Sequence, residues 1–129
     1  MIAIDAFFLN EDRHTNNIAV IRNENTKTFR MAPIFDNGLS LLSDVNDYPL
    51  GKDVYENIKS VKAKPFDMNF DKQLDAVEKL YGCCLRFSFT KTDVYDLMDS
   101  LKDVYDYEII RRVEKIILEQ MRKYPVFFG

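Results

Sequence analysis

Apolar residues recur at helical spacing over most of the second half of the chain. From Lys52 onward, successive apolar positions lie three or four residues apart, which is the pattern of an amphipathic helix. The pattern predicts four helices, whose apolar positions are Val54, Ile58 and Val61; Phe70, Leu74, Val77 and Tyr81; Val94, Leu97, Met98 and Leu101; and Ile109, Ile110, Val113, Ile116, Ile117 and Met121.

Residues that start or stop helices agree with this division. Gly82 is expected to end the second of the four helices, because glycine readily adopts the left-handed conformation found after a helix. Thr90, with Asp93 three residues later, is close to a capping box at the start of the third. The longest helix is predicted over 106–123, and Pro125 should stop it.

The first third of the chain has a different pattern. An apolar run without Gly or Pro predicts a helix over Met1–Leu9. The runs 18–22 and 27–32 are rich in β-branched or aromatic residues, and the polar turn 23–26 between them has hairpin length. Pro33 ends the second strand, because it cannot donate a ladder hydrogen bond.

Three further segments have weaker patterns. The stretch 39–52 fits a surface loop anchored by leucines and also an activation segment. The run 83–89 fits either a buried loop or a short strand, and 126–128 should fold back onto the core. The charged face of the longest helix, Arg112 included, is expected to face solvent. The fold class is therefore mainly α with one small β-hairpin, in a single domain spanning 1–129.

Composition narrows the function classes. Apolar residues make up 47% of the 129, and Gly and Pro number only four each, as in an ordered globular domain. The net charge of −3, without any basic block, argues against nucleic-acid binding. No apolar run is long enough to span a bilayer, and the amino terminus lacks a basic start, so neither a membrane protein nor a signal peptide is predicted.

The two cysteines are adjacent, Cys83 and Cys84. Neighbouring cysteines do not make an ordinary structural disulfide, and with a single His in the chain a zinc site is improbable. We interpret them as small apolar residues in a buried run. This interpretation suits a reducing cytoplasm, so a cytoplasmic location is expected.

Candidate chemistry is concentrated in residues 10–38. Asp12 precedes Asn17 by five residues, and Asp36 follows Asn17 by nineteen, with the predicted hairpin in between. The two ends of a hairpin lie side by side, so the loops before and after it should meet. One Asp to orient an attacking hydroxyl, with an Asn and a second Asp to hold magnesium, is the arrangement that phosphoryl transfer uses. The alternative is an Asx-rich turn before an ordinary hairpin.

The motifs in this stretch resemble those of atypical kinases. Residues 12–17, Asp-Arg-His-Thr-Asn-Asn, resemble the D-R-H-x-x-N catalytic loop of phosphoinositide-kinase-like enzymes, and residues 36–38, Asp-Asn-Gly, stand where those enzymes have D-F-G. The departure is Asn37, where Phe is usual. Given the small size and the helix-rich tail, the chain is more similar to the bacterial HipA-like and CtkA-like Ser/Thr kinases.

This resemblance implies roles for four residues. Asp12 would be the catalytic aspartate and His14 a residue that organises the loop, while Asn17 and Asp36 would bind magnesium and, through it, ATP. It also implies that residues 10–38 form the catalytic loop, hairpin and metal-binding loop of a kinase-like C-terminal lobe. A protein substrate with a Ser or Thr hydroxyl would then be the phosphate acceptor.

The sequence has no counterpart of a kinase N-lobe. Only eleven residues precede Asp12, and the four glycines, Gly38, Gly51, Gly82 and Gly129, form no phosphate-covering loop. We therefore expect a catalytic half that is inactive without an N-lobe; the alternative is a degenerate remnant that acts as a helical interaction module. Four apolar residues near the first helix are expected to form an exposed surface that binds a separate N-lobe chain or a second copy: Ile2, Ile4, Phe7 and Phe8.

Overall fold

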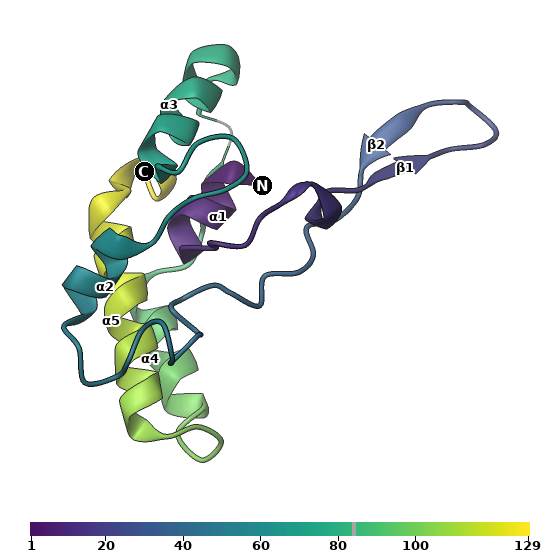
Figure 1. Ribbon diagram of the computed structural model, residues 1–129. Coiled ribbons are helices and arrows are strands. Elements are labelled where there is room, and N and C mark those ends of the chain that lie inside the picture. Colours follow the sequence, from purple (N-terminus) through teal and green to yellow (C-terminus); the bar gives the residue numbers. More distant parts are fainter. Residues whose placement is uncertain (84) are drawn as a thin grey trace.

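The computed structural model describes residues 1–83 and 85–129. Within these ranges the chain is mostly helical with one two-stranded antiparallel hairpin, as the sequence predicts (Figure 1). The helices are α1 (Ile2–Phe8), α2 (Val54–Ser60), α3 (Phe70–Tyr81), α4 (Lys91–Ser100) and α5 (Tyr107–Lys123), with short 3₁₀ turns η1 (Thr15–Asn17) and η2 (Pro125–Phe127). None of the helices in the described ranges is long and apolar enough to cross a membrane.

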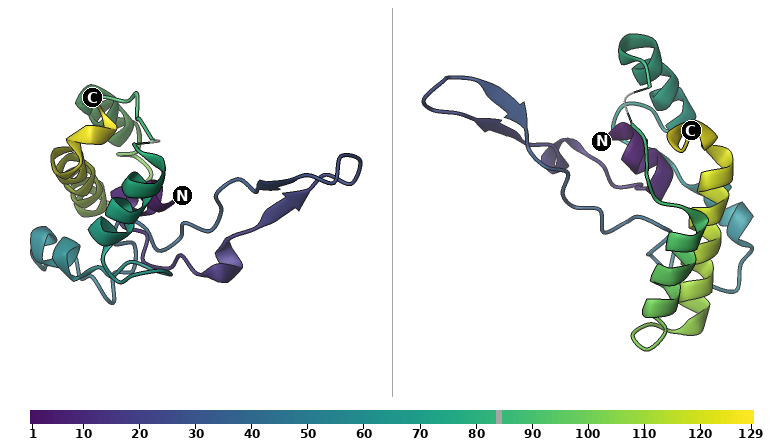
Figure 2. Two further views of the ribbon diagram at one scale, coloured as in Figure 1. Left: turned by 90° about the horizontal axis from the view of Figure 1, so that it is seen from above. Right: turned by 180° about the vertical axis from the view of Figure 1, so that it is seen from behind.

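The hairpin projects away from the helical body, as all three views show (Figures 1 and 2). Strand β1 (Val20–Arg22) pairs with β2 (Phe29–Met31), with Val20 opposite Met31. The side chain of Asn23 closes the turn by accepting hydrogen bonds from the next backbone amides. Every residue of both strands is exposed, so the polar turn predicted from sequence is correct but the strands bury no face.

Side-chain caps fix the starts of three helices. The capping box predicted at Thr90 and Asp93 is present at the start of α4. Asp53 caps α2 and Asn69 caps α3 by accepting bonds from backbone amides of the first turn. Gly82, with φ of 72°, follows the last residue of α3 as the sequence predicts. Each cap satisfies amides that would otherwise lack partners.

The core surrounds α1, which packs against α3 and α5. Ala6 and Phe7 on α1 and Ile116 on α5 are completely buried. The Phe7 ring meets the rings of Phe87 and Phe128, with centroids 4.8 and 5.6 Å apart, so the segment before α4 and the carboxyl-terminal segment close over α1. The predicted return of the carboxyl terminus is thus confirmed for its two phenylalanines.

Several exposure predictions were wrong. Phe7 is buried rather than part of an exposed apolar surface, and Leu97 is 54% exposed although it falls on the apolar side of α4. Cys83 is exposed rather than buried, and Cys84 lies outside the described residues. Val126 is exposed, whereas Phe127 is buried. The spacing of apolar residues shows which side of a helix faces the core. It does not show how much of that side the neighbouring elements cover.

Two polar residues of α5 turn inward: Arg112 is half-buried where the pattern predicted solvent, and Gln120 is buried where the pattern gave no signal. The Arg112 guanidinium donates to the backbone carbonyls of Leu42 and Tyr48, which ties the long loop before α2 to α5. Gln120 is fully buried and its amide donates to the carbonyls of Ala6 and Phe7, at 2.9 and 3.0 Å. Those carbonyls belong to the last turn of α1, where backbone carbonyls have no amide partner within the helix.

Candidate active site

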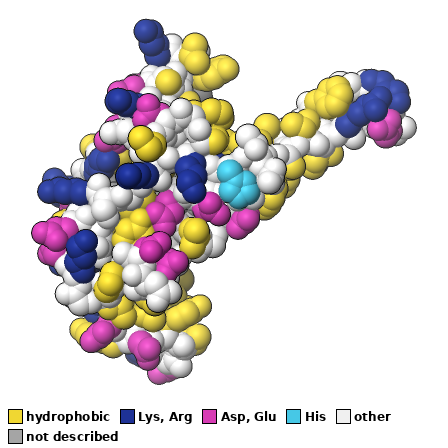
Figure 3. Space-filling model, viewed as in Figure 1, with side chains coloured by type: hydrophobic (Ala, Val, Ile, Leu, Met, Phe, Trp, Pro, Cys, Tyr) yellow, Lys and Arg dark blue, Asp and Glu magenta, His cyan; other side chains and the backbone are white. Residues whose placement is uncertain are grey.

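Asp12 and His14 lie on the loop that follows α1. Leu9 ends the helix in a left-handed conformation, and the chain then runs through Asp12 to η1. The Asp12 carboxylate is flanked on both sides: Lys64 Nζ lies 3.2 Å from Oδ1, and His14 Nε2 lies 3.8 Å from Oδ2. Figure 3 shows His14, the single His of the chain, at the surface where the hairpin meets the helical body, with acidic side chains beside it.

Asn17, the last residue of η1, is only 6% exposed. Its side-chain Nδ2 donates to the backbone carbonyl of Asp12 at 3.1 Å. This bond fixes the amide and brings Asn17 and Asp12 together within one loop. Because the nitrogen is engaged, the Oδ1 oxygen is the end of the amide that is left to bind a cation.

The buried side chain of Arg13 joins this loop to the loop after the hairpin. Its guanidinium is completely buried and forms a bidentate pair with Asp5 of α1, with N–O distances of 3.0 and 2.9 Å. Nη1 also donates to the carbonyls of Asn17 and Phe35, at 3.1 and 2.6 Å, and Nη2 donates to Asn37 Oδ1 at 2.6 Å. All five N–H donors of the guanidinium therefore have acceptors.

Asp36 lies between two of the groups that Arg13 holds. Phe35 and Asn37, its neighbours, both accept hydrogen bonds from the guanidinium, so the backbone on either side of Asp36 is anchored to the Asp12 loop. Asp36 itself is exposed and has a φ of 55°. Asp is among the few non-glycine residues that adopt this left-handed conformation readily.

A second set of contacts connects the site to α5. The hydroxyl of Tyr48 donates to the carboxylate of Glu11, the residue before Asp12, while Arg112 holds the carbonyl of Tyr48. Burial, together with the hydrogen bond to Glu11, raises the pKa of Tyr48 well above its ordinary value of 10.0. Tyr48 is therefore a neutral hydrogen-bond donor throughout the physiological pH range.

Asn17 and Asp36 supply oxygen donors, the type of ligand that magnesium prefers. No group of three or more His, Cys, Asp and Glu side chains that could hold a metal occurs in residues 1–83 and 85–129. Magnesium, however, is usually bound by one or two protein oxygens and completes its shell with phosphate and water. The amide oxygen of Asn17 and the carboxylate of Asp36 are hard oxygen ligands of that kind.

Sequence reasoning missed the residues that hold the site together. Arg13 and Asn37 belong to the motifs but received no structural role, and neither Asp5 nor Lys64 was given a role in the site. The available signal was Asp5, a charged residue inside an otherwise apolar helix, because a buried carboxylate requires a partner. Nothing in the sequence connects Lys64 with Asp12, fifty-two positions earlier.

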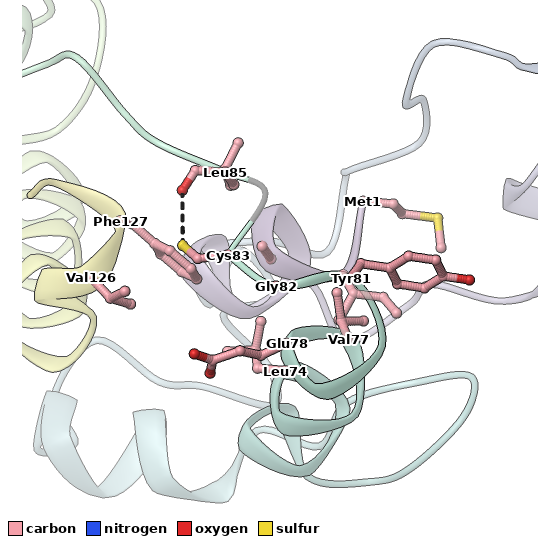
Figure 4. Close-up of a pocket in the computed structure, with 12 residues that line it drawn as sticks. Met1, Leu74, Val77, Glu78, Tyr81, Gly82, Cys83, Leu85, Val126 and Phe127 are labelled. Carbon is pink, nitrogen blue, oxygen red and sulfur yellow. Dashed lines mark hydrogen bonds between the residues drawn. The ribbon is translucent and has the colours of Figure 1, made fainter.

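An apolar cavity of about 370 Å³ lies elsewhere, between α1, the end of α3 and η2 (Figure 4). Ile2, Leu74, Val77 and Phe127 are among the residues that line it. It contains none of the four candidate site residues, and it adjoins the amino-terminal helix where an apolar surface was expected. Of the four residues named for that surface, Ile2 lines this cavity, and Ile4 and Phe8 line a smaller one beside Asn10.

The chain is similar to a protein kinase. Serine/threonine-protein kinase CtkA of Helicobacter pylori strain J99 is 27% identical over 124 residues, which cover 91% of this chain and 35% of the relative. The chain thus spans about a third of the length of the curated relative it matches. No protein-family model matches the chain, and no solved structure matches it significantly. The similarity supports a relationship to protein kinases.

Proposed function

We propose that this chain is the catalytic half of an ATP-dependent protein kinase of the HipA-like type, forming its C-terminal lobe. It would transfer a phosphoryl group from ATP to a Ser or Thr hydroxyl of a protein. The observation that carries the proposal is the pair of loops bearing Asp12, Asn17 and Asp36, which Arg13 ties together through Asn17 and Phe35. The similarity to CtkA over most of the chain supports the same class.

Each residue has a role in the proposed reaction. Asp12 orients the acceptor hydroxyl and takes its proton as the hydroxyl oxygen bonds to the γ-phosphorus. The bond from the γ-phosphorus to the bridging oxygen breaks, and ADP leaves with the electron pair. Asn17 and Asp36 would hold the magnesium ion, which would neutralise charge on the phosphates. His14, beside the other oxygen of Asp12, orients the carboxylate.

The proposal includes a requirement for a second lobe, from the same polypeptide or from a partner. In kinases a glycine-rich loop over the phosphates and a lysine on a strand supply much of the binding energy for ATP. Asn17 and Asp36 alone should bind Mg-ATP with a dissociation constant on the order of millimolar or weaker. The exposed strands of the hairpin offer a surface that such a lobe would cover.

Phosphate transfer from labelled ATP to dephosphorylated casein tests the proposal. The chain alone is expected to show no transfer above background. A hybrid in which this chain replaces the matching segment of H. pylori CtkA should be active, and Asp12→Asn should lower its rate about 10²- to 10⁴-fold because the base is lost.

The control for this assay is Asp103→Asn, which makes the same charge change at an exposed position and should leave the rate unaltered. If Asp12→Asn leaves the transfer rate of the hybrid unchanged, the proposed role of Asp12 is wrong. Asp12-dependent transfer by the chain alone would reject the need for a second lobe.

A further inference from the structure

We propose that Lys64 is a phosphate-binding residue of the candidate site and takes the terminal phosphate of a nucleoside triphosphate. The inference rests on the proposed function, which it deepens by assigning the cation that faces the transferred group. Its starting observation is that Lys64 Nζ lies 3.2 Å from Oδ1 of Asp12, the proposed base. Lys64 comes from the loop between α2 and α3, far from the catalytic loop in sequence.

The loop that carries Lys64 is anchored in the core. Val61 and Ala63 are buried, at 9% and 1% exposure, and the Ala63 amide donates to the carbonyl of Met68 at 2.9 Å. The side chain of Gln73 on α3 donates to the carbonyl of Asp67 at 2.7 Å, which holds the far side of the loop. The backbone on both sides of Lys64 is therefore anchored, and the exposed lysine side chain reaches from it to the Asp12 carboxylate.

The ion pair is open to solvent and to substrate. The side chains of Lys64 and Asp12 are 54% and 36% exposed, and that of His14, on the other oxygen, is 42% exposed. Pairs this exposed contribute little to folding stability, so the lysine is not needed there as a structural cation. A group arriving at Asp12 would meet the ammonium at the surface.

The chemistry of phosphoryl transfer calls for a cation at this place. Charge is spread over the oxygens of the group in transfer, and positive groups aimed at them lower the barrier. An ammonium is a compact charge with three donors, and it suits a phosphate that presents several oxygens. Before ATP binds, Lys64 is paired with Asp12; with ATP bound, its remaining donors face the γ-phosphate beside that carboxylate.

The same loop supplies a matched control. Lys62 stands two residues before Lys64 and is also exposed. It lines a separate cavity between α2, α3 and α5 rather than the Asp12 loop. Replacing either lysine by Met removes the same charge from the same loop and keeps the aliphatic part of the side chain.

Binding of Mg-ATP and Mg-ADP, followed by amide chemical shifts of the ¹⁵N-labelled chain, tests the proposal without measuring activity. Lys64→Met should weaken Mg-ATP binding about tenfold, the effect of one charge-assisted hydrogen bond, and leave Mg-ADP binding unchanged. Lys64→Arg should keep most of the affinity, and Lys62→Met should alter neither ligand. Unchanged shifts in α4 and α5 would show that each variant is folded.

Two results would overturn the assignment of Lys64. One is Mg-ATP binding by Lys64→Met that equals the wild type; the other is an equal loss for ATP and ADP, since that would place the lysine away from the terminal phosphate. Either result leaves the proposed function standing if Mg-ATP still shifts the loops at 10–17 and 35–38. If Mg-ATP at concentrations well above millimolar shifts neither loop in the wild-type chain, both proposals fail.

Discussion

At the scale of single residues, Arg13 connects α1 with the loops before and after the hairpin. Its guanidinium binds α1 through Asp5 and also holds backbone groups on both sides of the hairpin. A charged group removed from water in this way is tolerated only when its partners are present. The positions of Asn17 and Asp36 thus depend on a side chain that is itself completely buried and does not contact substrate.

Replacing Arg13 by Met is expected to destabilise the fold by about 3–5 kcal/mol, because Asp5 would be left buried without its cation. Urea unfolding followed by circular dichroism measures the change. Arg111→Met is the control: this arginine is exposed and pairs with Glu114 on the surface of α5, so its loss should cost less than about 1 kcal/mol. Equal losses for the two variants would contradict the buried role of Arg13.

Sequence spacing was enough to select Asp12, Asn17 and Asp36 as candidates, because motif residues stand at fixed distances along the chain. It was not enough to find what supports them. Charged residues are usually exposed, so Arg13 gave no sign of being buried. Its partners Asp5 and Asn37 lie 8 and 24 positions away, and only the folded chain brings them together.

At the scale of elements, local chemistry predicted most of the structure. In residues 1–83 and 85–129, the five α-helices and the hairpin occur close to the predicted ranges, and the Thr90 capping box and Gly82 act as expected. The caps at Asp53 and Asn69 followed the same rule and could have been recognised. The burial of Gln120 could not, because its partners are carbonyls at the end of α1, more than a hundred residues away.

Ile116 tests the packing of α5. Its side chain is completely buried in the middle of the apolar stripe, so Ile116→Ala should cost about 2–5 kcal/mol by creating a cavity. Thermal or urea unfolding gives the value. Leu80→Ala on α3 is a fitting comparison, because Leu80 is 72% exposed and its truncation should change stability by less than about 0.5 kcal/mol. A loss below that level for Ile116 would contradict the assignment of the core face of α5.

At the scale of the whole molecule, the hairpin is the least expected feature. A two-stranded hairpin is marginally stable by itself, and here both strands are exposed, with Val20, Phe29 and Met31 on one face. Sequence predicted the hairpin but not its projection, because the position of an element depends on what it packs against. In the proposed function, the second lobe would cover this apolar face and close the nucleotide site.

The proposed site itself depends on two loops meeting around one metal ion. The most direct test is paramagnetic broadening of amide signals when Mn²⁺ and ATP are added to the ¹⁵N-labelled chain. The comparison variant is Asp36→Asn, since Asn tolerates the left-handed backbone found there and removes only the charge. Asp103→Asn makes the same charge change away from the site and serves as its control.

We expect broadening concentrated at residues 10–17 and 35–38 in the wild type and in Asp103→Asn, and several-fold weaker in Asp36→Asn, because the metal would lose its charged protein ligand. Broadening that is centred elsewhere, or that is equally strong in Asp36→Asn, would contradict a magnesium–ATP site built from Asp12, Asn17 and Asp36.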